Sequence, residues 1–213
     1  MGSPTTPPCL VCNSIARRVF DFLAQYQYKL QHDPAERDLH FRRGGFCPFH
    51  TWQYHRFSSS CGECASYSEF LQEIGEWLLA VAAGDMTIDK LVRELDQHPA
   101  GAPACIVCEL AAKAEAEALE KALSGLDLAA ATEDASFLLC FPHLKAVAAK
   151  CADSGKVRLL IRRHAEAFKS VAENMRQYEA KLKNRQRNLI TDAEQQAAWR
   201  GLMLLAGRNE RRS

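Results

Sequence analysis

The chain has 213 residues, 47% of them hydrophobic and 25% charged, a composition typical of a folded globular protein and not of a disordered one. The formal net charge of +1 excludes a globally basic nucleic-acid binder. The first residues carry no export signal, and no stretch approaches the roughly 18 uninterrupted apolar residues of a membrane helix. We therefore expect a cytoplasmic protein without a membrane-spanning segment.

The first predicted helix covers residues 13–30, because its apolar residues recur at spacings of three and four. These residues are Ile15, Val19, Phe20, Phe22 and Leu23. Cys9 and Cys12 stand at its amino end, with two residues between them. The free N–H groups and the positive dipole end of a first helical turn favour thiolates, and this spacing lets both sulfurs face one metal ion.

A second helix is predicted after a polar stretch and a glycine turn. Gly44 and Gly45 are expected to take the positive φ of a tight turn. Pro48 predicts the first position of the helix, which places Cys47 and His50 three residues apart on its first turn. We expect the starts of the first and second helices to meet at one ion.

The helical pattern continues from residue 51 to about residue 84, with a break near SSSCGEC. Its predicted core-facing residues are Tyr67, Phe70, Leu71, Ile74, Trp77, Leu78 and Val81. A short amphipathic helix follows in residues 87–98, and the prolines and glycine of HPAGAP indicate a boundary at residues 98–104. We predict a first unit in residues 1–98 and a second in residues 99–213.

The second half repeats the arrangement of the first. Cys105 and Cys108 begin a helix rich in alanine and glutamate, and LLCFPH later supplies Cys140 and His143. The offset is 105 − 9 = 96 residues between the Cys-x-x-Cys pairs and 140 − 47 = 93 between the Cys-x-x-His pairs. This near-constant offset indicates an internal duplication. Because the second copy lacks the glycine turn, we expect its site to be held differently or to be the weaker one.

The remaining sequence predicts a short helix to about residue 153, a long helix and a last short one. Apolar residues of the long helix alternate spacings of four and three, which is typical of a helix packed lengthwise on others. The stripe contains Val157, Ile161, His164, Phe168, Val171, Met175, Tyr178 and Leu182. We interpret His164 as a hydrogen-bonded core residue. Thr191 and Glu194 have the spacing of a capping box, and Gly207 is expected to end the last helix.

The predicted fold is all-α, because no stretch shows the sustained alternation of a β-strand. We expect a helical bundle of two pseudo-repeated units, each clamped by a metal ion, with a long C-terminal helix. Each predicted quartet joins the Cys-x-x-Cys pair and the Cys-x-x-His pair of one half. The predicted ligands are Cys9, Cys12, Cys47 and His50 in the first half and Cys105, Cys108, Cys140 and His143 in the second.

Two kinds of metal centre agree with these ligands. Three cysteines and one histidine fill a tetrahedral structural zinc site and leave no open position for a substrate, so two zinc ions are our first interpretation. The alternative is an iron-sulfur cluster for electron transfer or redox sensing, which three cysteines and one histidine also hold. The spacing of the cysteines does not separate the two hypotheses.

The other cysteines and the catalytic motifs point to no reaction. Cys61 and Cys64 form a third Cys-x-x-Cys pair without a histidine, and Cys151 stands alone. We interpret these three as incidental, with extra ligands or a redox dithiol as alternatives. The sequence has no phosphate-binding glycine loop, nucleophile elbow or dinucleotide fingerprint, so no catalytic residue is nominated and a binding or adaptor protein is favoured over an enzyme.

The charge distribution gives a weak indication of partners. From residue 156 to the end, 14 lysines and arginines face 6 aspartates and glutamates, whereas residues 85–155 hold 6 against 12. A basic helix of this kind suits nucleic acid or an acidic protein, but we favour a solvated helix face whose charge is partly offset by the acidic middle of the chain. We therefore expect another protein as the partner and do not favour nucleic acid.

The chain also resembles a bacterial family of uncharacterised proteins, a domain of unknown function. The family has a Cys-x-x-Cys pair at a helix start, Gly-Phe-Cys-x-x-His further on, a second such set, and a Glu-x-x-x-x-Trp-Arg stretch before Leu-Ala-Gly. The matching residues are Gly45 and Phe46 beside the eight ligands, then Glu194, Trp199, Arg200, Leu205, Ala206 and Gly207. Departures are Leu10 and Ile106, where the family often has proline, and Cys-Phe-Pro-His. The resemblance supports the duplication and the metal ligands and implies no activity.

Overall fold

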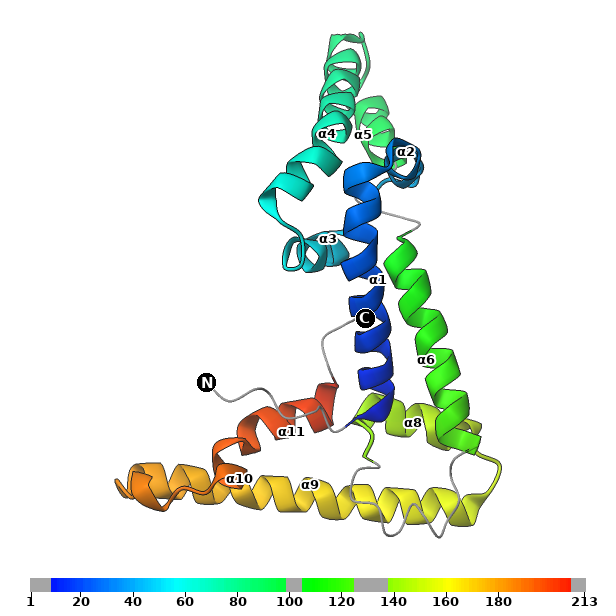
Figure 1. Ribbon diagram of the computed structural model, residues 1–213. Coiled ribbons are helices and arrows are strands. Elements are labelled where there is room, and N and C mark those ends of the chain that lie inside the picture. Colours follow the sequence, from blue (N-terminus) through cyan, green and yellow to red (C-terminus); the bar gives the residue numbers. More distant parts are fainter. Residues whose placement is uncertain (1–8, 99–104, 125–137, 208–213) are drawn as a thin grey trace. The chain divides into compact units, whose positions relative to one another are not determined.

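The computed structural model describes residues 9–98, 105–124 and 138–207, and every element in these ranges is a helix (Figure 1). The all-α prediction is therefore confirmed for the described residues. The chain divides into two compact units, which we call unit 1 (Met1–Arg17 and Lys113–Glu210) and unit 2 (Arg18–Ala112 and Arg211–Ser213). This division crosses the two halves predicted from the sequence, and most of the predicted boundary at residues 98–104 lies outside the described residues.

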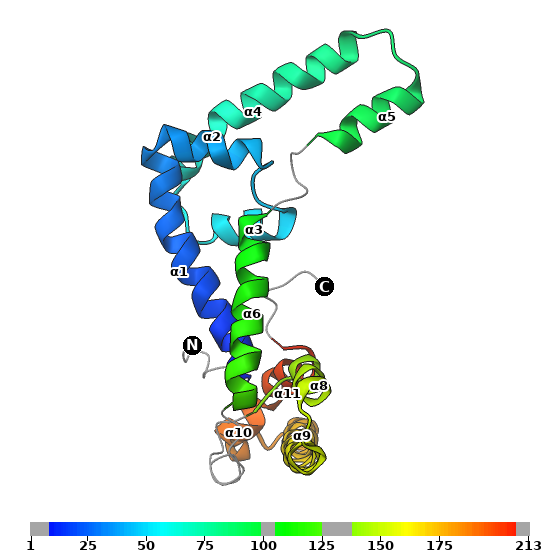
Figure 2. The same cartoon turned by 90° about the vertical axis from the view of Figure 1, so that its right-hand side faces the viewer.

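Unit 2 takes most of α1 and the helices that follow it. They are α1 (Leu10–His32), α2 (Pro34–Arg42), α3 (Pro48–His55), α4 (Ser60–Ala83), α5 (Ile88–Gln97) and the first turns of α6 (Ile106–Ser124). The predicted break between residues 51 and 84 is confirmed, because α3 ends at His55 and α4 begins at Ser60. The helices α4 and α5 form a hairpin (Figure 2).

The helix α2 was missed by the sequence reasoning, which treated these residues only as a polar stretch. The Asp33 side chain accepts hydrogen bonds from the backbone N–H groups of Ala35 and Glu36, at 3.0 and 3.3 Å, and Pro34 occupies the first helical position. This Asp-Pro sequence is a regular helix start. The turn that follows was predicted correctly, since Gly44 and Gly45 have φ values of 81° and 78°.

An aromatic cluster around His40 forms part of the core of unit 2. The His40 ring lies 4.5 Å from the Phe46 ring, centroid to centroid, and its Nε2 atom is 3.3 Å from the Tyr67 hydroxyl. Phe41 and Phe70 stack with a centroid distance of 4.5 Å. This cluster holds the glycine turn, and with it the start of α3, against α1 and α4.

His40 makes the stability of unit 2 depend on pH. Burial, with a contribution from Arg43, lowers the pKa of His40 from 6.5 to about 4. Between about pH 6.5 and pH 4, His40 is protonated in the unfolded chain but neutral in the folded chain. The free energy of unfolding therefore falls as the pH falls from 6.5 to about 4. Between pH 7 and pH 5 the loss is about 2 kcal/mol for this group alone.

We expect His40→Gln to have a shallower decline of unfolding free energy between pH 7 and pH 5 than the parent protein, measured by urea denaturation. Glutamine keeps a polar atom near the Tyr67 hydroxyl and does not titrate. Any pH-dependent loss of metal is common to both proteins and cancels in the comparison. Parallel declines in the two proteins would contradict the assignment.

Unit 1 contains the first turns of α1, the rest of α6 and the C-terminal helices. The latter are α8 (Phe141–Lys150), α9 (Ser154–Lys183), the 3-10 helix η1 (Arg187–Leu189), α10 (Asp192–Gln195) and α11 (Ala197–Ala206). The capping box of Thr191 and Glu194 is confirmed, and α10 and α11 pack back on α9 (Figure 1). None of the helices in the described residues is long and apolar enough to cross a membrane.

The predicted apolar stripes of the long helices are only partly buried. On α4, Phe70 is buried, whereas Leu71 and Leu78 are 65% and 44% exposed, so the prediction that both face the core is wrong. On α9, Val171 is buried but Ile161 is 48% exposed. On each of these two helices, the side that is buried against other helices is narrower than the apolar face predicted from the spacing of its residues.

Candidate metal centres

The structure brings the eight predicted ligands together in two groups of four, but it exchanges their partners. Site 1 consists of Cys9, Cys12, Cys140 and His143, and site 2 consists of Cys47, His50, Cys105 and Cys108. In each site the four ligand atoms lie within 4.8 Å of one another. The predicted pairing within each half is wrong, because each Cys-x-x-Cys pair meets the Cys-x-x-His pair of the other half. Site 1 lies within unit 1 and site 2 within unit 2.

All four ligand pairs occupy the same place in a helix. Cys47 and Cys140 are the N-caps of α3 and α8, while Cys9 and Cys105 directly precede α1 and α6. The second ligand of each pair follows three residues later, on the first turn. Two helix starts therefore face each site, although not the two that the sequence analysis paired. Their positive dipole ends would offset the net charge of 2 − 3 = −1 of a divalent ion with three thiolates.

In site 1 the histidine ring nitrogen lies among the three sulfurs. His143 Nδ1 is 3.3 Å from Cys9 Sγ, 3.4 Å from Cys12 Sγ and 3.1 Å from Cys140 Sγ. The Sγ atoms of Cys12 and Cys140 are 3.7 Å apart, too far for a disulfide bond. The four donors thus form a compact tetrahedron.

Site 2 has nearly the same dimensions. His50 Nδ1 is 3.1 Å from Cys47 Sγ and 3.3 Å from the Sγ atoms of both Cys105 and Cys108. The Sγ atoms of Cys47 and Cys108 are 3.7 Å apart. Both sites therefore use Nδ1 of the histidine as the donor atom.

These distances match the edges of a tetrahedron around a single ion. With metal–sulfur bonds of about 2.3 Å and a metal–nitrogen bond of about 2.05 Å, a regular tetrahedron has sulfur–sulfur edges of about 3.8 Å and sulfur–nitrogen edges of about 3.6 Å. The Cys12–Cys140 and Cys47–Cys108 sulfur–sulfur distances are 3.7 Å, close to that edge. The sulfur–nitrogen distances, 3.1 to 3.4 Å, are shorter than the ideal edge. A single four-coordinate ion fits between the donors of either site.

The crowding of site 1 shows why a cation suits it. Hydrogen bonds from Cys12 and then Cys140 hold the pKa of Cys9 far below its usual range, and the same interactions with Cys12 and Cys9 push the pKa of Cys140 far above its own. Burial would lower the pKa of His143, but its hydrogen bonds with Cys12 and Cys9 outweigh burial and raise it to about 10. The pKa values of Cys9 and Cys140 thus shift in opposite directions, as expected for two neighbouring thiols that repel each other when both are ionised, and a cation between them would relieve that repulsion.

His164 fixes the segment that leads into site 1. Its Nε2 atom accepts the backbone N–H of Leu139 at 2.8 Å, and its Nδ1–H donates to the Leu160 carbonyl at 2.8 Å. Next to it, the N–H of Leu10 donates to the Leu138 carbonyl at 3.4 Å. The interpretation of His164 as a hydrogen-bonded core residue is confirmed. Its role is to place the residue before Cys140.

Gly207, at the end of α11, packs directly against two cysteines of site 1. It ends α11 with φ 76° and ψ −170°, a conformation essentially restricted to glycine. A Cβ atom at this position would lie 3.0 Å from Cys140 Sγ and 3.1 Å from Cys12 Sγ. The backbone of Gly207 therefore covers two of the sulfurs.

We expect Gly207→Ala to destabilise unit 1 by about 2 kcal/mol through backbone strain, and to weaken metal retention at site 1 through the crowded sulfurs. Urea unfolding and metal analysis measure the two effects. Gly75→Ala is the matched control, because a Cβ there meets nothing within 4 Å and helix propensity favours alanine. Equal stability of the Gly207 variant and the parent would contradict this account.

Glu115 is a residue of site 1 that the sequence reasoning missed. Its Oε1 atom lies 3.0 Å from His143 Nε2, so Nε2–H donates to the carboxylate and Nδ1 is left to face the sulfurs. The 96-residue offset between the Cys-x-x-Cys pairs pairs Glu115 with Val19, which is fully buried and carries no polar atom. The same helix also carries Glu109, Glu117 and Glu120, so the sequence alone does not single out Glu115.

The two sites also differ in exposure. All four ligands of site 1 are buried, with His143 the most exposed at 7%. In site 2, Cys105 and His50 are buried, but Cys47 is partly accessible and Cys108 is exposed. The expectation that the altered Cys-Phe-Pro-His motif marks a weaker site receives no support from burial, because that motif belongs to the more enclosed site.

The remaining cysteines lie outside both groups. Cys61 and Cys64 are exposed on the first turn of α4, and Cys151 caps the end of α8 with its thiol 3.7 Å from the Asp153 carbonyl. The interpretation of these three as extra ligands finds no support among the described residues.

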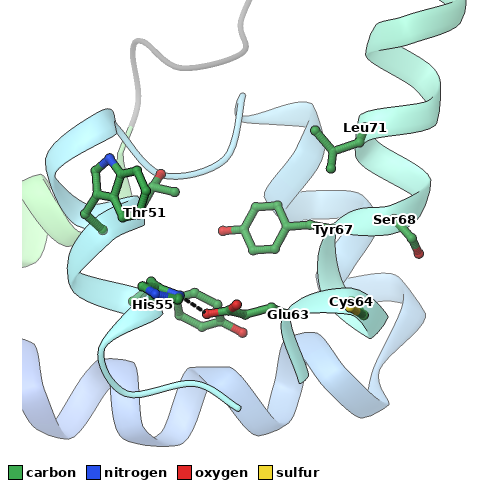
Figure 3. Close-up of a pocket in the computed structure, with 9 residues that line it drawn as sticks. Thr51, His55, Glu63, Cys64, Tyr67, Ser68 and Leu71 are labelled. Atoms are coloured by element: carbon green, nitrogen blue, oxygen red, sulfur yellow. Dashed lines mark hydrogen bonds and ion pairs between the residues drawn. The ribbon is translucent and has the colours of Figure 1, made fainter. Parts of the chain in front are cut away.

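Unit 2 also contains a pocket of about 430 Å³ between α3 and α4 (Figure 3). Tyr67 lies at its centre, and the His55–Glu63 pair, with Nδ1 and Oε1 2.7 Å apart, borders it. Trp52 on α3 and Leu71 on α4 also line it and are 68% and 65% exposed. Most of the pocket's surface is apolar.

No protein-family model, curated protein or solved structure matches the chain. The resemblance to a bacterial family therefore stays a prediction that rests on the motif residues.

Proposed function

We propose that each site binds one zinc ion and that the two ions are structural. The observation that carries this proposal is the tetrahedral spacing of three sulfurs and one Nδ1 atom in both sites. Four protein ligands complete the coordination of zinc and leave no position for a substrate, which is the arrangement of a structural centre. Each ion would hold the starts of two helices together.

Zinc is favoured over the iron-sulfur alternative by the size of the sites. In a cluster the protein ligands are divided among two or more irons, so donor atoms on different irons lie farther apart than the edge of one tetrahedron. Here all donors fall within 4.8 Å, and the sulfur–sulfur distances fit a single ion. Free thiolates of this kind also fit a reducing compartment, and on that ground we propose the cytoplasm as the location.

The composition of the purified protein tests this proposal. After anaerobic purification we expect a colourless protein with two zinc ions per chain and no acid-labile sulfide. Substitution with cobalt is expected to give the visible absorption of a tetrahedral thiolate site. A brown protein that contains iron and sulfide would instead establish the cluster.

We further propose that the zinc-stabilised fold serves a binding role and that the partner is a protein with a basic amphipathic helix. Exposed Trp52 and Leu71 border the α3–α4 pocket, and Leu79, further along α4, is 72% exposed. Exposed apolar residues around an apolar pocket are typical of protein-binding sites. Residues 60–98 contain eight acidic and two basic residues, so charge favours a basic helix over an acidic one or nucleic acid.

A labelled amphipathic peptide of leucine and lysine serves as the probe, with a leucine–glutamate peptide as the control. We expect the basic peptide to bind, by fluorescence anisotropy, and Trp52→Ala to weaken binding at least tenfold. Leu189→Ala is the control variant, because Leu189 is 54% exposed but lies in unit 1. Equal binding of both peptides, or of both variants, would refute this surface.

A further inference from the structure

The two sites have the same ligands and nearly the same dimensions, yet their surroundings differ. Glu115 contacts the histidine of site 1, and the equivalent position in the other copy is Val19. Site 1 is enclosed, whereas Cys108 of site 2 is exposed. We propose that site 1 retains its zinc and site 2 exchanges its zinc, and that Glu115 is a positioning residue for His143. This inference rests on the proposed binding of zinc.

Glu115 acts on the donor strength and orientation of His143. Because Nε2–H donates to the carboxylate at 3.0 Å, the imidazole is held in the tautomer whose Nδ1 lone pair points at the three sulfurs. The nearby negative charge also makes Nδ1 a better donor. Removal of such a partner typically costs about 10- to 100-fold in metal affinity.

The exposure of the ligands also favours retention of zinc at site 1 and exchange at site 2. A thiol or chelator takes a metal ion by forming a bond to it while a protein ligand leaves, and this requires an approach to the site. At site 1 the three cysteine residues are at most 4% exposed, and Gly207 lies against Cys12 and Cys140. At site 2 Cys108 is an exposed residue and Cys47 is partly exposed. A competing ligand therefore reaches site 2 first.

Zinc transfer to a coloured chelator, 4-(2-pyridylazo)resorcinol in excess, measures this difference on the full chain. We expect two phases of one zinc each. Alkylation by iodoacetamide during the fast phase, read by mass spectrometry, assigns it without any mutation. Cys47, Cys105 and Cys108 are expected to react in that phase, while Cys9, Cys12 and Cys140 stay protected.

Substitutions at Glu115 test its role. Glu115→Gln keeps an acceptor without charge and is expected to speed the slow phase, and Glu115→Ala is expected to speed it further, by 10- to 100-fold. The fast phase should not change. Glu120→Gln, on the exposed side of the same helix, is the control. The cobalt spectrum of site 1 should also shift in the Glu115 variants, which a loss of packing alone would not cause.

Each failure has its own meaning. A purified protein without zinc would refute the proposed function itself. Release of both ions in a single phase, or alkylation of the site 1 cysteines first, would overturn the proposed difference between two zinc sites. If Glu115→Ala changes neither the slow phase nor the cobalt spectrum, Glu115 does not position His143.

Discussion

Cys12→Ser combined with Cys140→Ser is expected to leave one zinc ion on each chain, whereas Cys12→Ser combined with Cys47→Ser is expected to leave none. In the structure Cys12 and Cys140 belong to one site, so the second substitution removes nothing more. Cys12 and Cys47 belong to different sites, so each substitution removes one ion. Metal analysis of the purified double variants gives the count directly.

The same experiment separates the observed pairing from pairing within each half. If Cys12 and Cys47 shared a site, the two double variants would exchange their results. Cys151→Ser is the control, because Cys151 lies outside both groups and should leave two ions and an unchanged unfolding transition. Loss of metal from the control would mean that the ligand sets are misassigned.

Removal of zinc is expected to have the largest effect on stability. Structural zinc contributes on the order of 10 kcal/mol of apparent binding free energy, which is comparable to the whole stability of a typical domain. A strong chelator should therefore abolish the cooperative thermal unfolding of both units, as followed by circular dichroism, and added zinc should restore it. Lower pH should act in the same direction, because protons compete for the thiolates.

A chelated protein that keeps its unfolding transition would contradict a structural role for the ions. Magnesium is the control cation, since it prefers oxygen ligands and should restore nothing.

The identity of the ligands could be predicted from the sequence because the constraint is local. A cysteine before a helix and a second donor three residues later form a pair through helical geometry alone, as at Cys47 and His50. The same holds for the capping box, where Thr191 accepts a hydrogen bond from the Glu194 N–H and the Glu194 side chain accepts one from the Thr191 N–H. Such features depend on a few consecutive residues.

The pairing of the sites could not be predicted from the same information. The offsets of 96 and 93 residues indicate a duplication, but they are equally consistent with pairing inside each copy and between copies. The length of the first helix argues against pairing within the first half. With 23 residues, α1 is about 34 Å long, so the segment that soon follows its end is poorly placed to share an ion with Cys9 and Cys12 at its start.

Glu115 was missed for a related reason. A glutamate in a helix rich in alanine and glutamate looks like any solvated residue, and only its contact with His143 Nε2 distinguishes it. The exposure of Leu71 and Leu78 could not be predicted either. The spacing of apolar residues identifies the apolar face of a helix, but not how much of that face another helix covers.

With the exchanged pairing, the chain segment that site 2 closes into a loop lies within the longer segment that site 1 closes. Site 2 joins residues 55 apart, from His50 to Cys105, and site 1 joins residues 128 apart, from Cys12 to Cys140. Once the inner loop is closed, the outer one is shortened to 128 − 55 = 73 free residues. Its closure then costs about 0.5 kcal/mol less entropy. Folding is thus favoured from the inner, accessible site towards the outer, enclosed one, and loss of the inner ion makes the outer site slightly harder to form.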